Sequence, residues 1–345
     1  MEKDRKILQV NNMKTQFFTE SGIVRAVDGV SFHVNRGEVL GIVGESGCGK
    51  SVTALSIMGL VGAPGRIVDG NVMLDDQDLA KLTQKELSAI RGNRISMIFQ
   101  QPQSSLNPVF RVGDQISEVL HVHQHMDRDA AKERTIELLT LVGIPSPESR
   151  YNSWPHEMSG GMAQRVMIAM ALACTPELLV ADEPTTALDV TIQAQILDLI
   201  RDLKTKMDTA VIFITHDLGV VAELCDRVVV MYAGRIVETA EVNELFENPK
   251  HPYTAALIGA TPILGDVDRE LISIPGSVPN LINLPTGCKF APRCVARIEN
   301  KLEICKTEDP ELKMHSKDHE VRCWLYDRPT EVAKAVETVN AGGAA

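Results

Sequence analysis

The chain has 345 residues, of which 44% are hydrophobic and 4% aromatic, and its formal net charge is −11. This length predicts two or three structural units, and the acidic balance argues against broad nucleic-acid binding, which needs clustered positive charge. No apolar run approaches the ~20 residues that span a bilayer, and the start lacks the apolar stretch of a secretory signal. We therefore expect a cytosolic protein whose seven cysteines are thiols or metal ligands rather than disulfides.

The first predicted elements are strands. The segments KILQVNNMKTQFF and AVDGVSFHV carry alternating or β-branched apolar positions. EVLGIVG is a short continuous apolar run, which is typical of a buried parallel strand. KSVTALSIMGLV then has apolar residues at helical spacing. The glycine-rich stretch GESGCGKS, residues 44–51, is therefore a loop between a strand and a helix.

Later segments alternate between helix and strand. DRDAAKERTIELLTLVGI predicts an amphipathic helix that ends at Gly143 and Pro145. ELLVADEP and AVIFITHD predict two more buried strands, each after a helical pattern, which is the alternation of an α/β domain. VVVMYAGRIVETA predicts a hairpin that turns at Ala233 and Gly234. Pro and Gly are frequent from about residue 250 to 290, which predicts a boundary into a loop-rich appendix.

The loop at 44–51 fits the phosphate-binding pattern G-x-x-x-x-G-K-S/T between a strand and a helix. Its glycines let successive N–H groups face inward at a helix N-terminus, where they bind a phosphate. Lys50 is expected to reach the β- and γ-phosphates, and the Ser51 hydroxyl is expected to ligate Mg²⁺. The alternative is a glycine-rich turn that matches by chance, which the strand before and the helix after it disfavour.

Acidic and imidazole groups follow two of the predicted strands. Asp182 is expected to hold Mg²⁺ through water, and Glu183 to polarise the attacking water as general base. His216 ends a neighbouring strand, where it is expected to reach the γ-phosphate region. An isolated acid pair or a lone histidine is more often structural, but a phosphate loop in the same chain favours the catalytic interpretation.

The segment EMSGGMAQRVMIAMALA predicts a helix capped by Ser159. Gly160 and Gly161 would weaken that helix start, unless a phosphate approaches its N–H groups. Because the loop at 44–51 already serves one nucleotide, we expect this second helix end to serve the nucleotide bound to another subunit.

The order of GESGCGKS, IFQQP, MSGGMAQRV, LLVADEPTTALD and ITHD resembles the nucleotide-binding subunit of an ABC transporter, over roughly residues 5–245. The resemblance implies an α/β fold of the P-loop NTPase class: a RecA-like parallel sheet with an antiparallel β subdomain over residues 1–88 and 158–245, and a helical subdomain over 89–157. It implies ATP as substrate and Mg²⁺ as cofactor. Met162 departs from the family, in which many members have Gln, but this position is expected to face the helix.

The resemblance also implies the site residues. ATP is expected to contact Phe17, Gly44, Glu45, Ser46, Gly47, Cys48, Gly49, Lys50, Ser51 and Val52. Mg²⁺ is expected at Ser51, Gln100 and Asp182, and catalysis at Glu183, His216 and Gln100. Ser159, Gly160, Gly161, Gln164 and Asp189 are expected to act on the partner's nucleotide. Phe17 is preferred to Phe18 as the ring that stacks on adenine, because of its spacing from AVDGVSF.

The appendix defines the subfamily. HPYTAALIGATP, IPGSVPNL and LPTGCKFAPRC are similar to the C-terminal extension of the ATPase subunits of oligopeptide and dipeptide ABC importers. This implies a C-terminal domain over 246–330, with a disordered tail over 331–345. The implied partners are a second, different ATPase subunit, two integral membrane permeases and, indirectly, an extracytoplasmic peptide-binding protein, with the chain at the cytoplasmic face of the membrane. Importers of nickel, glutathione or another small solute, and a soluble ABC ATPase without a membrane partner, remain alternatives.

Four cysteines lie close together in the appendix. Cys288, Cys294, Cys305 and Cys323 follow the spacing C-x5-C-x10-C-x17-C, which invites a metal centre. Structural zinc sites usually pair their ligands as C-x2–4-C, and no such pair occurs here. The wider spacing suits a 4Fe–4S cluster with a structural role, and the resemblance favours the same choice. Zn²⁺ and four unrelated buried thiols are the alternatives.

Overall fold

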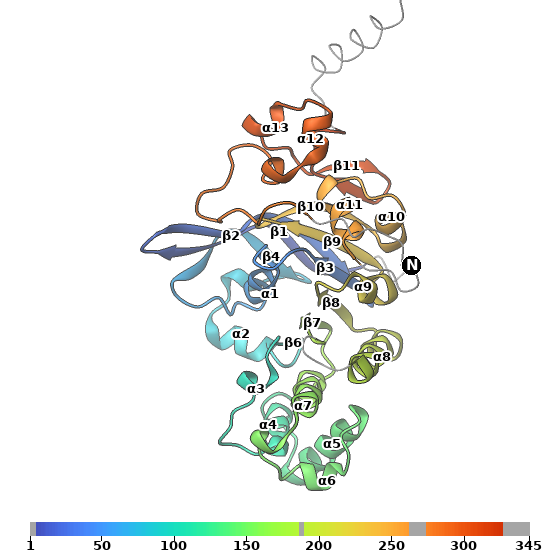
Figure 1. Ribbon diagram of the computed structural model, residues 1–345. Helices are drawn as coiled ribbons and strands as arrows, with labels where there is room; N and C mark the ends of the chain where they lie inside the picture. Colours follow the sequence, from blue (N-terminus) through green and yellow to red (C-terminus); the bar gives the residue numbers. More distant parts are fainter. Residues whose placement is uncertain (1–4, 186–189, 262–273, 327–345) are drawn as a thin grey trace, which may run out of the picture.

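The computed structural model of the chain describes residues 5–185, 190–261 and 274–326. Figure 1 shows two sheets in the middle of the molecule, a group of helices at the lower end and the C-terminal segment at the upper end. Within the described residues, no helix combines the length and the apolar character that crossing a membrane requires.

The larger sheet has eight strands in the order β11-β12-β10-β9-β3-β8-β7-β6. They are β3 (Val39–Val43), β6 (Ile95–Ile98), β7 (Leu178–Asp182), β8 (Ala210–Ile214), β9 (Arg227–Tyr232), β10 (Arg235–Glu241), β11 (Lys313–Ser316) and β12 (His319–Val321). The five strands from β9 to β6 are parallel. Every residue of β3, β7 and β8 is buried, as the continuous apolar runs predict.

The smaller sheet is antiparallel, with strand order β2-β1-β4-β5. Its strands are β1 (Lys6–Thr19), β2 (Gly22–Asn35), β4 (Gly65–Leu74) and β5 (Gln77–Asp78). Its buried face shares one core with β3, β8 and α1 (Lys50–Ile57), so α1 lies between the two sheets. Helix α2 (Gln84–Ile90) begins with a capping box between Thr83 and Glu86.

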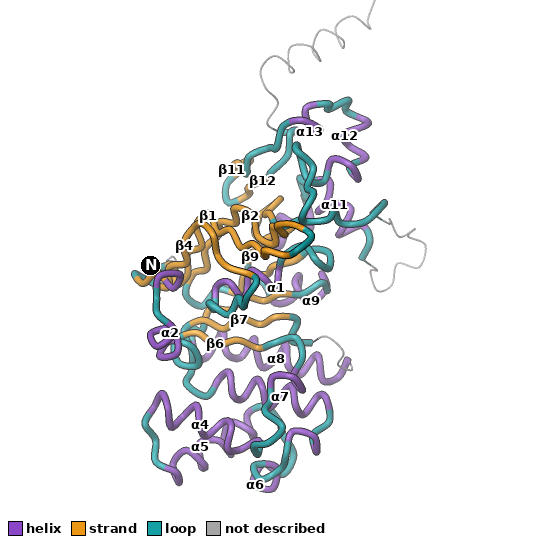
Figure 2. Tube along the Cα trace, turned by 90° about the vertical axis from the view of Figure 1, so that its left-hand side faces the viewer, coloured by secondary structure: helices purple, strands orange, loops and turns teal. Residues whose placement is uncertain are grey.

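The helices between β6 and β7 gather at one end of the sheets, as Figure 2 shows from the side. They are α3 (Pro102–Ser105), α4 (Val112–Gln124), α5 (Arg128–Leu141), α6 (Pro147–Arg150) and α7 (Gly160–Leu172). Apolar side chains of α4, α5 and α7 form one core with residues of β3, β6 and β7. The segment 89–157 thus contains the end of α2 and then β6, a strand of the parallel sheet, before the helices from α3 onward. The predicted combination of a parallel sheet, an antiparallel sheet and a helical layer is confirmed.

The C-terminal segment returns to the sheet. After α8 (Val190–Met207), α9 (Leu218–Leu224), α10 (Val242–Glu247) and α11 (Pro252–Gly259), the short helices α12 (Val295–Glu299) and α13 (Ile304–Thr307) precede β11 and β12. Strand β12 pairs with β10, and the fully buried His319 Nε2 lies 2.7 Å from the Glu238 carboxylate. Sequence patterns did not indicate β11 and β12, because β11 is short, polar and exposed throughout. The expected tail 331–345 lies outside the described residues.

Candidate nucleotide-binding site

The loop at 44–51 connects β3 to α1, as the sequence predicts. Gly44, Gly47 and Gly49 have φ angles of 150°, 77° and 108°, a region that favours glycine. A Cβ at Gly44 would collide with the carbonyl oxygen of Met231, and one at Gly49 with that of Ala26. Cys48 is buried, which raises the pKa of its thiol, whereas Ser46 and Gly47 are exposed. The loop is thus enclosed on its inner side and open on its outer side.

The Lys50 ammonium group lies inside the loop. Its Nζ donates to the carbonyl oxygens of Gly44, at 2.7 Å, and Glu45, at 3.1 Å. The side chain is buried without a carboxylate bonded to it in the described residues. An ammonium has three donors that rotate freely, so this group can turn from the carbonyls to an incoming phosphate.

Two carboxylates lie beside the loop. Asp182 ends β7, and the Ser51 hydroxyl donates to its Oδ1 at 3.1 Å. Burial raises the pKa of Asp182, although the hydrogen bond from Ser51 opposes this shift. Glu183 follows with a φ of 48° and bonds through its N–H to Ile214 at 2.9 Å. A buried carboxylate beside a hydroxyl is a donor set that suits Mg²⁺.

The Glu183 carboxylate meets two side chains from neighbouring strands. Gln100 Nε2, beyond β6, donates to its Oε2 at 2.9 Å, and His216 Nδ1, beyond β8, lies 3.4 Å from its Oε1. All these strands are parallel, so their carboxyl ends share the edge from which the loop at 44–51 leaves β3. The structure therefore gathers Lys50, Ser51, Gln100, Asp182, Glu183 and His216 at one edge.

The helix α7 presents its N-terminus to solvent. Ser159 is its cap, and its hydroxyl accepts the N–H of Met162 at 3.3 Å. A Cβ at Gly160 would meet no atom within 4 Å, so an anion can approach this end from outside. The buried Gln164 side chain donates to the carbonyl of Pro184 at 2.7 Å, which ties α7 to the chain just after Glu183. Asp189 lies outside the described residues.

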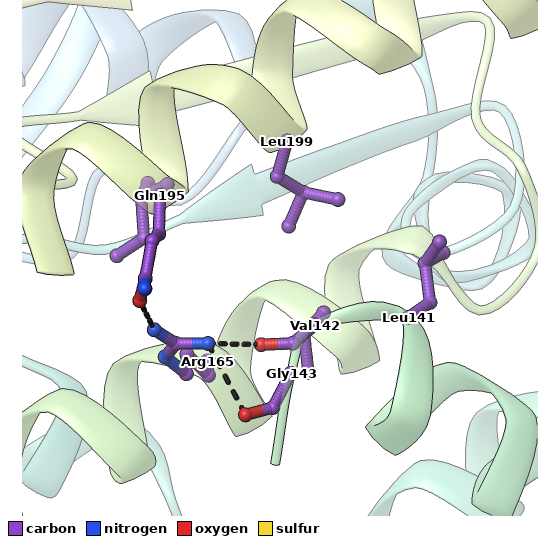
Figure 3. A pocket seen from close by; sticks show the side chains of 7 residues that line it. Leu141, Val142, Gly143, Arg165, Gln195 and Leu199 are labelled. Atoms are coloured by element: carbon purple, nitrogen blue, oxygen red, sulfur yellow. Dashed lines mark hydrogen bonds between the residues drawn. The ribbon is translucent and has the colours of Figure 1, made fainter.

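Arg165 fixes α7 from the other side. Figure 3 shows its guanidinium pointing toward the end of α5, where it donates to the carbonyl oxygens of Val142, at 2.7 Å, and Gly143, at 3.2 Å. It also donates to the side chain of Gln195 in α8. One arginine thus links three helices behind the capped end of α7.

The two candidate adenine-stacking rings lie on opposite faces of β1. The Thr15 hydroxyl lies 2.8 Å from that of Ser56 in α1, and alternation along the strand puts Phe17 on the same face. Phe18 faces the other way: it is 38% exposed, with the Arg66 guanidinium 4.5 Å from its ring centre.

Two residues that sequence analysis did not single out also touch the loop. The Tyr253 hydroxyl accepts the N–H of Glu45, and the Arg293 guanidinium forms an ion pair with the Glu45 carboxylate. Both belong to the C-terminal segment. No short-range motif could have indicated these contacts, because their partners are 208 and 248 positions apart in the chain.

The four cysteines of the C-terminal segment border one narrow cavity of about 10 Å³. They are Cys288, Cys294, Cys305 and Cys323, all free thiols. Burial raises the pKa of Cys288 and Cys323 to about 12 and that of Cys305 to about 11. Across the described ranges, no three His, Cys, Asp or Glu side chains are arranged to hold a metal ion. The predicted cluster therefore gains no support from an assembled metal site.

Residues 27–186 match the ABC transporter family, and residues 237–300 match the C-terminal region of oligopeptide/dipeptide transporters. The chain is 52% identical to the oligopeptide transport ATP-binding protein AppD of Bacillus subtilis, over 93% of this chain and 97% of that protein. It is 47% identical to the dipeptide transport ATP-binding protein DppD of Escherichia coli, over 92% and 96%. Among solved structures, the dimeric ATP-binding cassette MJ0796 bound to ADP and Pi is 27% identical, with a TM-score of 0.63 over 68% of this chain and 98% of that one.

Proposed function

Because the chain belongs to the ABC transporter family, among the ATP-binding proteins of oligopeptide and dipeptide transport, we propose that it is the ATP-hydrolysing motor of a peptide importer. The observation that carries this proposal is the gathering of Lys50, Ser51, Asp182 and Glu183 at one sheet edge, in a chain that also carries the oligopeptide/dipeptide transporter C-terminal region. Phosphate binding by Lys50 and Ser51 and activation of a water beside Asp182 and Glu183 require these two pairs of groups to lie side by side.

The loop at 44–51 binds the phosphates of ATP through its N–H groups and Lys50, and Val52 continues α1 below it. Lys50 exchanges the carbonyl oxygens of Gly44 and Glu45 for phosphate oxygens. Phe17 stacks on adenine, which is supported by its place on the face of β1 that looks toward α1.

Ser51 and Asp182 would hold Mg²⁺, with Gln100 as a third group nearby. When bound, Mg²⁺ neutralises charge on the phosphates. Glu183 then takes the proton of the attacking water as general base. His216 and Gln100 hold the Glu183 carboxylate from two sides, and His216 can turn its ring N–H from Glu183 to the γ-phosphate.

The working ATPase is a dimer, in which the N-terminus of α7 acts on the partner's nucleotide. Ser159, Gly160 and Gly161 supply the donors, Gln164 holds the helix in place, and Asp189 connects the two sites. Support comes from the open space around Gly160 and from the dimeric state of the related cassette MJ0796. The partner is a second, different ATPase subunit of the same family.

Cross-linking tests this arrangement. Cysteines at Ser46 in one subunit and Ser159 in its partner should cross-link when Mg·ATP is added, and Ser88→Cys, at an exposed position of α2, is the matched control. Cross-links that form only within one chain would refute the dimer.

The motor works at the cytoplasmic face of the membrane on two integral permease subunits, which receive peptide from an extracytoplasmic binding protein. Cells whose only copy carries Lys50→Ala should fail to grow when a required amino acid is supplied as a dipeptide or oligopeptide, and should grow normally on the free amino acid. Normal growth on both sources would refute peptide import. Loss of nickel or glutathione uptake instead would identify another cargo, and recovery of the chain without any membrane subunit would identify a soluble ATPase.

The four-cysteine cavity holds a 4Fe–4S cluster with a structural role. Support comes from the convergence of all four thiols on one cavity and from their burial. The spacing of the four cysteines has none of the close C-x2–4-C pairs usual in zinc sites, whereas a cluster bonds each cysteine to a separate iron. When bound, the cluster ties together loops that have little core of their own. Protein purified without oxygen should be brown and lose its visible absorbance with Cys294→Ser, and colourless protein with stoichiometric zinc would refute the cluster.

A further inference from the structure

Arg293 is the most direct link between the C-terminal segment and the phosphate loop. It ends a short 3-10 helix, Ala291–Arg293, and its side chain is only 6% exposed. Nη1 lies 2.6 Å from Oε2 of Glu45, and Nη2 lies 2.9 Å from Oε1. Two parallel bonds between a guanidinium and a carboxylate fix the direction of both groups as well as their distance. A third bond, from Nε to the carbonyl oxygen of Pro275 at 2.7 Å, holds the arginine in its own segment.

Tyr253 contacts the same loop residue, Glu45, at its backbone N–H. The tyrosine is fully buried, and its hydroxyl accepts the N–H of Glu45 at 2.8 Å. Its ring packs against those of Tyr232 and Phe290, with ring centres 4.7 Å and 5.4 Å apart. Because the packed rings fix the position of the Tyr253 hydroxyl, movement of the loop would break its hydrogen bond with Glu45.

Glu45 connects these contacts to the phosphate-binding groups. Its carbonyl oxygen accepts from Lys50 Nζ at 3.1 Å, so its N–H, side chain and carbonyl are all engaged. Its carboxylate also lies next to the loop that receives the negative phosphates. Without Arg293 this charge would repel the nucleotide, and the repulsion would be strong because the site is partly buried. Arg293 thus fixes the position of Glu45 and neutralises its charge.

We infer that Arg293 and Tyr253 are positioning residues for ATP binding, which hold the loop at 44–51 in its receptive conformation through Glu45. The C-terminal segment is therefore part of the nucleotide site, in addition to any role in assembly. This inference rests on ATP binding by the loop, and it is independent of the transported solute.

The test uses the purified full chain and measures three quantities: the Kd for ATP, the KM and kcat of hydrolysis, and the Tm. Tyr253→Phe removes one hydroxyl and keeps the ring. Since one net hydrogen bond corresponds to a factor of about 2–10 in an equilibrium constant, the Kd and the KM should rise by about that factor. The kcat at saturating Mg·ATP should stay within about twofold of wild type, because no group that meets the reacting atoms has changed.

Arg293→Lys keeps the positive charge but loses the bidentate pair with Glu45, so it should raise the Kd for ATP less than Arg293→Ala does. The double variant Glu45→Ala with Arg293→Ala should bind ATP better than the sum of the two single effects predicts, because the charge and its partner leave together. Arg322→Lys is the control: Arg322 anchors the same segment through the carbonyl oxygens of Ile236 and Pro310 and does not contact the loop. It should leave the Kd unchanged even where the Tm falls.

If Arg293→Ala does not fold, Tyr253→Phe and Arg293→Lys still decide the question. Wild-type Kd values in both would overturn the inference, as would losses no larger than that of Arg322→Lys at equal Tm. Failure of the unmodified chain to bind ATP would instead refute the proposed function.

Discussion

Replacing Glu183 with glutamine tests the proposed general base with the smallest change in shape. The side chain keeps its length, and its amide oxygen can still accept from Gln100 Nε2, which now lies 2.9 Å from Oε2. The backbone N–H bond to Ile214 is untouched, and glutamine experiences the same backbone φ of 48°. Only the ability to take a proton is removed.

The expected loss follows from that single change. A positioned general base contributes about 10²–10⁴-fold to a rate, which corresponds to about 3–5 kcal/mol of activation free energy. We expect kcat to fall by this factor. The Kd for ATP should stay near the wild-type value, because Lys50 and Ser51 make their contacts without Glu183.

Phosphate release at saturating Mg·ATP measures kcat, and equilibrium binding of nucleotide measures the Kd for ATP. The matched control is Glu177→Gln, at the opposite end of β7, where the carboxylate pairs with Arg36 and Arg94. These partly exposed pairs contribute about 0–1 kcal/mol each to the free energy of unfolding, so the control should lower the Tm slightly and keep kcat. Hydrolysis by Glu183→Gln within about threefold of wild type would contradict the role of a general base.

Further predictions concern three residues around the site. Because burial raises the pKa of Asp182, its proton competes with Mg²⁺ at a higher pH than for an ordinary aspartate. The Kd for Mg·ATP should therefore rise as the pH falls, and Asp182→Asn should bind more weakly at every pH and lack this dependence. In the metal-free protein the raised pKa means that the folded state binds the Asp182 proton more tightly than the unfolded state does. The contribution of Asp182 to the free energy of unfolding should therefore decrease as the pH rises through its raised pKa, which denaturation at several pH values can show. Arg165→Ala removes bonds to Val142, Gly143 and Gln195; it should lower ATP-dependent dimer formation more than monomer ATP binding, and equal losses in both would contradict a role specific to α7. Cys294 directly follows Arg293, so Cys294→Ser should raise the Kd for ATP in chains purified without oxygen, and an unchanged Kd would show that the cavity and the loop are uncoupled.

The nucleotide-binding edge could be predicted from the sequence because each part of it is local. Every catalytic group follows a buried parallel strand by a few residues, and parallel strands end at one edge. The contact of Ser51 with Asp182 spans 131 positions, yet the strand order brings the two together once both motifs are recognised. The sequence alone does not favour Phe17 over Phe18 strongly, because the proposed stacking depends on which face of β1 looks toward α1.

The C-terminal contacts could not be predicted in this way. Arg293 and Tyr253 meet Glu45 only because the chain returns over the loop after α11, and their own neighbours in the sequence carry no motif for a phosphate site. β11 and β12 were missed for a related reason: they are stabilised by pairing with β10 and by the buried Glu238–His319 contact, while β11 itself has no apolar alternation. Tertiary context determines both features.

Peptide uptake into liposomes tests the central claim most directly. The chain is reconstituted with its partner ATPase, the two permease subunits and the binding protein, and uptake of labelled dipeptide and oligopeptide is followed with and without Mg·ATP. The account predicts uptake that requires Mg·ATP, is lost with Lys50→Ala or Glu183→Gln, and persists with Glu177→Gln. Uptake of peptide at the same rate without ATP or with Glu183→Gln, or ATP hydrolysis that never moves peptide, would contradict it.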